Sequence, residues 1–174
     1  MQEKFMRRAL EIARESLDEP DALPYGAVIV RDGEIVGEGL NKAIALHDPT
    51  SHGEVEAIRD ACRRLGTTDL VGCDIYTTAE PCSMCVATMH VTGIARLFYA
   101  SASAQSTMFA ERLTTVNGKW KRRVSGDGLR HEVGLPLDQR PCRPRKYWPR
   151  KRTNCSRNMP SAKVREIRVP DQIC

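Results

Sequence analysis

Two short runs of residues constrain the fold of this 174-residue chain most, because each stands at the start of a predicted helix. The first run is His52-Gly-Glu54 and the second is Pro81-Cys-Ser-Met-Cys85. Apolar residues then recur at helical spacing over 53–65, up to Gly66, a residue type that commonly ends helices. Proline suits a first helical turn, so a second helix is predicted over 82–92. Both runs are therefore expected at helix N-termini.

The rest of the chain alternates strand and helix patterns, which indicates the α/β class. We expect a helix over 4–17 and strands over 25–30 and 35–40, joined by a hairpin at Asp32-Gly33. Strands over 73–78 and 94–99 flank the second helix, which favours a right-handed parallel crossover. Further on, we expect a helix over 102–113, a loop over 114–128 and an edge strand over 129–135.

The two runs together supply a set of metal ligands. A catalytic zinc site takes three protein ligands and leaves a fourth position for water. One imidazole, from His52, and two thiolates, from Cys82 and Cys85, fit that number. Two cysteines three residues apart at a helix start can face one point, and the helix dipole favours their thiolate form. We therefore expect these three residues to hold Zn²⁺, which lowers the pKa of the water it binds.

Glu54, two residues after His52, is the expected catalytic residue. Hydrolysis of an amidine needs a group that carries protons from water to the ring nitrogen and to the departing amine. Other interpretations exist for each run alone. Ser51 to Glu54 also fits a helix capping box, and a lone CxxC pair fits a redox site or half of a structural zinc site. The combination H-x-E followed by P-C-x-x-C is far more specific, and it is a known zinc deaminase signature.

The charge of the chain is unevenly distributed, although the total is +5. Residues 1–138 carry 16 Lys and Arg against 20 Asp and Glu, whereas residues 139–174 carry 11 against 2. Prolines recur in the second part without any helical or strand period. We interpret residues 1–138 as one zinc-dependent deaminase domain and residues 139–174 as a basic, Pro-rich tail without stable structure. Basic residues confined to a tail are poor evidence that the body binds nucleic acid.

The sequence also bears on cellular location. No apolar run approaches the ~20 residues of a membrane span, and the charged N-terminus does not resemble a signal peptide. Without a secretory signal, the seven cysteines indicate metal binding or catalysis more than disulfides. We therefore expect a cytoplasmic protein.

Over about residues 5–112 the chain resembles the cytidine deaminase-like superfamily, and within it the bacterial guanine deaminase and tRNA adenosine deaminase branch. The stretches that carry the resemblance are Pro24-Tyr-Gly-Ala-Val-Ile-Val30, Gly39-Leu-Asn41, Asp48-Pro-Thr-Ser-His-Gly-Glu-Val-Glu-Ala-Ile58 and Glu80-Pro-Cys-Ser-Met-Cys85. The resemblance implies a three-layer α/β/α sandwich around a mixed five-stranded sheet, and a homodimer. It implies that Asn41 hydrogen-bonds the substrate, with Ala27, Ala79 and Tyr25 lining the pocket. Asn41 also fits the simpler role of a turn residue after a strand.

Three hypotheses about function remain open. The favoured one is an enzyme that deaminates a free nucleobase or nucleoside, with guanine or a related purine as first choice. Guanine deaminases typically carry an acidic residue beyond the last core strand, but here no acid occurs from Ser101 to Ala110. The second is a deaminase of tRNA or another polynucleotide, and the basic tail is the observation that favours it. The third is a zinc-stabilised interaction domain without catalysis.

Overall fold

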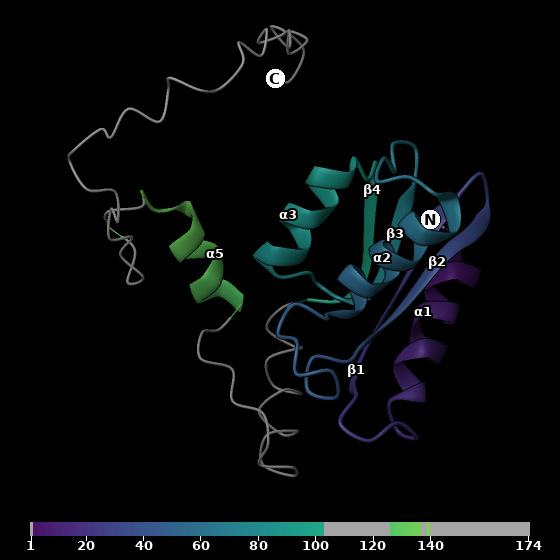
Figure 1. Cartoon of the computed structure of the whole chain (residues 1–174), viewed down its shortest axis with the longest axis horizontal. Coiled ribbons are helices and arrows are strands. Elements are labelled where there is room, and N and C mark those ends of the chain that lie inside the picture. The colour runs from purple at the N-terminus through teal and green to yellow at the C-terminus, as the bar shows by residue number, and fades with distance from the viewer. Residues whose placement is uncertain (1, 103–125, 137–138, 140–174) are drawn as a thin grey trace, which may run out of the picture.

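The structure, a computed structural model, describes residues 2–102, 126–136 and 139 (Figure 1). The chain begins with α1 (Glu3–Glu15), followed by the hairpin strands β1 (Leu23–Arg31) and β2 (Glu34–Asn41). Helix α2 (Gly53–Leu65), strand β3 (Asp74–Ala79), helix α3 (Ser83–Thr92) and strand β4 (Arg96–Ser101) come next. Helix α5 (Gly126–Gly134) is the last of the described elements. In the described residues, no helix is both long and apolar enough to cross a membrane.

The described strands form one mixed sheet in the order β2-β1-β3-β4. Strand β1 is antiparallel to both β2 and β3, and β3 is parallel to β4. The parallel pairing predicted around the second helix is therefore confirmed. At the hairpin, Asp32 and Gly33 have φ values of 53° and 82°, the positive angles that a two-residue turn of this kind requires. The α/β class is confirmed with four strands in the described residues, against the five that we predicted.

Alternate residues of the strands pack into two hydrophobic clusters. One cluster joins α1 to the sheet, and its aromatic centre is Tyr76, whose ring lies 5.3 Å from that of Phe5 and 4.6 Å from that of Phe98. The other joins α2 and α3 to the sheet and includes Ile75. Because side chains alternate between the faces of a strand, neighbours such as Ile75 and Tyr76 serve different clusters. In Figure 1, α1 lies across the sheet from α2 and α3.

Helix α2 lies unusually close to the sheet, because glycines face it. A Cβ atom on Gly39 of β2 would stand 2.2 Å from the backbone oxygen of Gly53 and 2.2 Å from the backbone nitrogen of Ala57. A Cβ atom on Gly53 would stand 2.4 Å from the carbonyl oxygen of Tyr25 in β1. Such distances are far below ordinary contact, so only glycine fits. These glycines let the N-terminus of α2, with His52 and Glu54, lie directly against the strands.

The C-terminal part of the prediction needs a correction. We predicted a loop up to residue 128 and an edge strand over 129–135, but residues Gly126–Gly134 form helix α5. The strand prediction was wrong because Leu129 and Val133, four positions apart, also fit one face of a helix. The helix predicted over 102–113 and the tail over 139–174 lie outside the described residues, apart from Ala102 and Gln139.

Candidate metal centre

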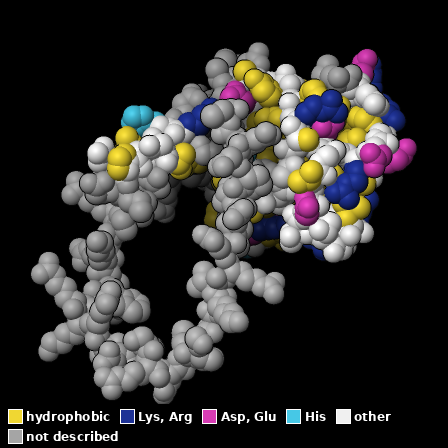
Figure 2. Space-filling model, turned by 90° about the horizontal axis from the view of Figure 1, so that it is seen from above, with side chains coloured by type: hydrophobic (Ala, Val, Ile, Leu, Met, Phe, Trp, Pro, Cys, Tyr) yellow, Lys and Arg dark blue, Asp and Glu magenta, His cyan; other side chains and the backbone are white. Residues whose placement is uncertain are grey.

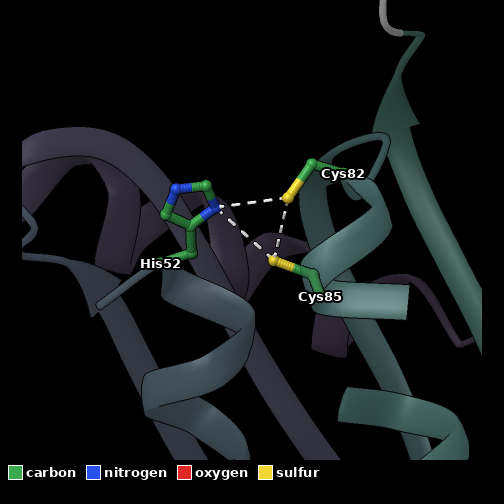
Figure 3. Close-up of side chains that lie close together, drawn as sticks. All are labelled: His52, Cys82 and Cys85. Atoms are coloured by element: carbon green, nitrogen blue, oxygen red, sulfur yellow. Dashed lines mark hydrogen bonds between the residues drawn. The ribbon is translucent and has the colours of Figure 1, made fainter. Parts of the chain in front are cut away.

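The three predicted ligands meet at the N-termini of two helices (Figure 3). His52 is the N-cap residue of α2, and Cys82 is the N-cap residue of α3. Cys85 lies in the first turn of α3. The Nδ1 atom of His52 is 3.6 Å from the Sγ atom of Cys82 and 3.5 Å from that of Cys85, and the two sulfur atoms are 3.6 Å apart. Two distant parts of the chain thus supply one compact group of donor atoms.

The donor atoms have the spacing that tetrahedral zinc requires. With Zn–S bonds of about 2.3 Å and Zn–N bonds of about 2.0–2.1 Å, ligand atoms of a tetrahedron stand about 3.6 Å apart for S···N and about 3.8 Å for S···S. The observed distances of 3.5–3.6 Å agree with these values. One imidazole and two thiolates also match the N and S donors that zinc prefers. The group therefore fits Zn²⁺ by both chemistry and geometry.

The two cysteines differ in their acidity. Hydrogen bonding with Cys85, and then with His52, lowers the pKa of Cys82 to about 3 despite its partial burial. The same contact with Cys82, together with burial, raises the pKa of Cys85. The lowered pKa favours the thiolate form of Cys82. A thiolate is the form in which cysteine binds metals.

Glu54 lies beside this group without belonging to it. The ligand set of the described residues comprises only His52, Cys82 and Cys85. Glu54 is 6% exposed, and burial raises the pKa of its carboxyl group. Its side chain is in hydrogen-bond contact with Cys85. The carboxyl group is therefore held against the candidate ligand set.

The capping-box interpretation of Glu54 is wrong. That interpretation needs Ser51 as the N-cap residue of α2, with its hydroxyl accepting from the helix backbone. Instead, His52 is the N-cap residue, and its side chain makes no capping hydrogen bond. The hydroxyl of Ser51 donates to the carboxylate of Glu56 at 3.0 Å. Ser51 and Glu54 therefore do not form the reciprocal pair of a capping box.

A network that sequence analysis missed holds the loop before His52. The carboxylate of Asp48 accepts from the backbone N–H of Thr50 at 2.8 Å and from its hydroxyl at 2.7 Å. Arg59 of α2 donates to the Thr50 hydroxyl at 3.2 Å and pairs with Asp48 at 3.6 Å and with Glu56. Arg59 comes seven residues after His52, and the sequence offers no signal to distinguish it from a solvent-facing arginine.

The residues predicted to line a substrate pocket lie at the same end of the sheet. Leu23 pairs with Asn41 and Ala27 with Thr77, so the start of β1 meets the ends of β2 and β3. Asn41 and Ala79 are the last residues of their strands and are buried. Tyr25 and Ala27 belong to β1, Ala27 being fully buried and Tyr25 partly buried. The Oδ1 atom of Asn41 accepts from the backbone N–H of Ala43 at 3.2 Å.

A cavity of about 310 Å³ lies elsewhere, between α1, β2 and α2. None of the metal ligands lines it. Its charged side chains pair with each other, as Lys42 does with Glu19 and Arg64 with Asp60, both at 2.8 Å. Paired surface charges of this kind need no ligand. The metal centre is therefore a stronger candidate for the functional site than this cavity.

Comparison with known proteins bears on this centre. A sequence model of the cytidine and deoxycytidylate deaminase zinc-binding region matches residues 1–101. The chain is 43% identical over 99 residues to a guanine deaminase of Bacillus subtilis, covering 57% of this chain and 64% of that protein. It is 39% identical over 99 residues to a tRNA-specific adenosine deaminase of Aquifex aeolicus, covering 57% and 65%. The matched region thus spans slightly less than two thirds of either relative.

Solved structures of deaminases are similar to this chain as well. The crystal structure of the guanine deaminase from Bacillus subtilis has a TM-score of 0.70 and 31% identity, and the match covers 88% of each chain. A tRNA:A34 deaminase has a TM-score of 0.56 and 42% identity, covering 59% of this chain and 78% of that one. The matched residues 1–101 include all three ligands and Glu54. The chain therefore belongs to the family defined by the cytidine and deoxycytidylate deaminase zinc-binding region.

Proposed function

We propose that this protein is a zinc-dependent hydrolytic deaminase that converts an aminated nucleobase or nucleoside, with guanine or a related purine favoured, to the oxo product and ammonia. The observation that carries the proposal is the position of Glu54. It contacts Cys85 but lies outside the group of donor atoms. A purely structural zinc site has four protein ligands and needs no such carboxylate. Here the donor set has three members among the described residues.

Each residue then has a defined task. His52, Cys82 and Cys85 hold the zinc ion, which supplies Lewis-acid activation of water when bound. Glu54 takes a proton from water and delivers it to the ring nitrogen next to the amino-bearing carbon. It then carries the second proton of water to the departing amine. The C–N bond breaks, a C=O bond forms, and ammonia leaves. Burial of Glu54 keeps bulk solvent from competing for these protons.

Asn41 is proposed to bind the substrate through its amide nitrogen. Because its Oδ1 atom accepts from the N–H of Ala43, the amide is oriented so that its two N–H donors remain to meet an acceptor. A purine offers several such acceptors on its ring nitrogens and carbonyl oxygens. We propose that Tyr25, Ala27 and Ala79 line the same pocket, since all lie at that end of the sheet.

Guanine or a related purine is the favoured substrate because the guanine deaminase of Bacillus subtilis is similar over 88% of the chain. A tRNA adenosine is the second candidate. It is favoured by the 44% identity, over 97 residues, to a tRNA-specific adenosine deaminase of Agrobacterium fabrum. Among the described residues on the face drawn in Figure 2, however, acidic and basic side chains are interspersed, with no continuous basic patch. Recognition of tRNA relies on such patches.

The proposal is tested by measuring ammonia release from a panel of purines, pyrimidines, their nucleosides and a short RNA, with Glu54→Ala as the control. Release from one small purine, abolished in Glu54→Ala, supports the proposal. Release from RNA alone favours the second candidate, and RNA binding should then weaken steeply with added salt. A zinc-loaded protein that releases ammonia from none of these substrates would favour the zinc-stabilised interaction domain.

Other features of the sequence prediction belong to the proposal as well. We propose that residues 1–138 form the deaminase domain, with a fifth strand completing a three-layer α/β/α sandwich, and that residues 139–174 form a basic tail. We also propose a homodimer in the cytoplasm. A homodimer is tested by light scattering of the purified protein, and a monomer would contradict it.

A further inference from the structure

Helix α5 contacts the turn that leads into the metal-binding cysteines. The Nη2 atom of Arg130 in α5 donates to the Oε1 atom of Glu80 at 2.9 Å and to the carbonyl oxygen of Pro81 at 3.0 Å. Glu80 and Pro81 connect the end of β3 to Cys82, the first cysteine ligand. We propose that Arg130 is a positioning residue of the metal centre, which fixes the orientation in which Cys82 presents its thiolate.

The geometry of the turn explains how Arg130 acts. The carbonyl oxygen of Pro81 belongs to the peptide group that joins Pro81 to Cys82. Because a peptide group is planar, a donor held on that oxygen fixes the plane from which the Cα–Cβ bond of Cys82 departs. Pro81 contributes rigidity of its own, since its ring restricts φ and its side chain is fully buried. Arg130 therefore acts on the peptide group that leads into Cys82.

The same turn is held from its other side by β4. The backbone N–H of Glu80 donates to the carbonyl oxygen of Ser101 at 2.8 Å. The hydroxyl of Ser101 donates to the carbonyl oxygen of Thr78 at 3.0 Å. These contacts hold the residues up to Glu80, and Arg130 binds the carbonyl oxygen of the next peptide group, between Pro81 and Cys82. The turn is thus fixed between the sheet on one side and α5 on the other.

The contact of Arg130 with Glu80 and Pro81 is well suited to hold the turn in one orientation. A guanidinium group is rigid, and a charged donor makes a stronger hydrogen bond than a neutral one. The side chains of Arg130 and Glu80 are 33% and 30% exposed, so water screens them only in part. Groups that orient metal ligands commonly change metal affinity about 10- to 100-fold when they are removed. Removal of the Arg130 side chain is expected to lower zinc affinity by a factor in this range.

The test measures zinc release from the full-length protein in Arg130→Ala, Arg130→Lys and Glu80→Gln, with His131→Ala as the matched control. His131 is the exposed neighbour of Arg130 on the same helix. Transfer of zinc to a chromogenic chelator at neutral pH gives the rate. Thermal unfolding of each protein with and without zinc separates an effect on the metal from an effect on the fold.

Arg130→Ala is expected to release zinc at least about 10-fold faster than wild type, whereas His131→Ala releases it at the wild-type rate. The rate of zinc release from Arg130→Lys should lie between those of Arg130→Ala and wild type, because an ammonium group keeps the charge but lacks the planar fork of the guanidinium. Release from Arg130→Ala within twofold of wild type would overturn the inference. So would a variant that loses stability equally with and without zinc, since that result assigns Arg130 a structural role only. The inference rests on the metal centre, and a wild-type protein that binds no zinc would overturn both.

Discussion

The side chain of Glu54 is in hydrogen-bond contact with Cys85, although α2 carries one residue and α3 the other. This contact joins the group proposed to move protons to a residue proposed to hold the metal. Both helices begin at the same end of the sheet, and glycines let α2 approach the strands closely. The catalytic proposal therefore depends on backbone packing as much as on the ligands themselves.

Removal of zinc is predicted to lower the stability of the fold. A ligand present at 1,000 times its dissociation constant stabilises a protein by about 4 kcal/mol, which corresponds to about 8–16 °C in Tm for a chain of this size. Wild type treated with a chelator and Cys85→Ser should melt at similar, lower temperatures by calorimetry. Cys62→Ser is the control, because Cys62 is a partly buried free cysteine outside the ligand set. Equal melting temperatures with and without zinc would contradict the prediction.

Arg59→Ala is predicted to weaken zinc binding, because Arg59 holds the loop that positions His52 through Asp48 and Thr50. We expect about a 10-fold loss of zinc affinity by competition with a chelator. The side chain is 41% exposed, so the loss of unfolding free energy should be at most about 1 kcal/mol. Arg63→Ala serves as the control, since Arg63 is an exposed arginine of the same helix that pairs with Asp60. Equal zinc affinities in the two variants would exclude the positioning role of Arg59.

Gly39→Ala is predicted to destabilise the fold severely. The added Cβ atom would overlap backbone atoms of Gly53 and Ala57, which cannot move aside as a flexible side chain can. We expect a loss of about 3 kcal/mol or more, measured by urea unfolding. Gly134→Ala is the matched control, because nothing lies within 4 Å of the added atom there. A stable Gly39→Ala protein would show that the close packing of α2 on β2 is not required.

Stability is predicted to depend on pH through the pair Arg8 and Glu38. The two side chains form paired hydrogen bonds of 2.8 Å, and this contact holds the pKa of Glu38 below its usual value of 4.5. A lowered carboxyl pKa contributes stability above pH 4.5 that is lost as the pH falls through the folded-state pKa. Glu38→Gln should therefore cost about 1 kcal/mol at pH 7 and less at pH 3. The test is thermal unfolding of Glu38→Gln and wild type at both pH values, with Glu34→Gln, a variant at an exposed position, as the control. An equal loss of unfolding free energy in Glu38→Gln at pH 7 and pH 3 would contradict the prediction.

The parts of the fold that repeat a local pattern could be predicted from the sequence. The helix over 53–65 was predicted with its observed bounds, and the strands were predicted to within two residues at either end. The ligand triad was predictable because spacing within each run fixes which side chains share a helix start. Its geometry agrees with the expected zinc site.

Other features could not be predicted, because they depend on tertiary contacts. Leu129 and Val133 suit a helix or a strand, and nothing local favours α5. The partners of Arg59 and Arg130 are set by where the chain returns in space, since a long side chain can reach many places. The close approach of Gly39 to Gly53 likewise has no signature in one sequence. These contacts hold the segments that carry His52 and Cys82, so sequence analysis found the candidate ligands but missed their supports.

The central claim is that Glu54 moves protons without binding the metal. It is tested most directly by measuring zinc content and ammonia release together in Glu54→Gln, with Glu34→Gln as the control. Removal of a general acid–base group is expected to slow ammonia release by about 10²- to 10⁴-fold, while zinc content stays at one ion per chain. Loss of the zinc along with the activity, or ammonia release at the wild-type rate, would contradict the account.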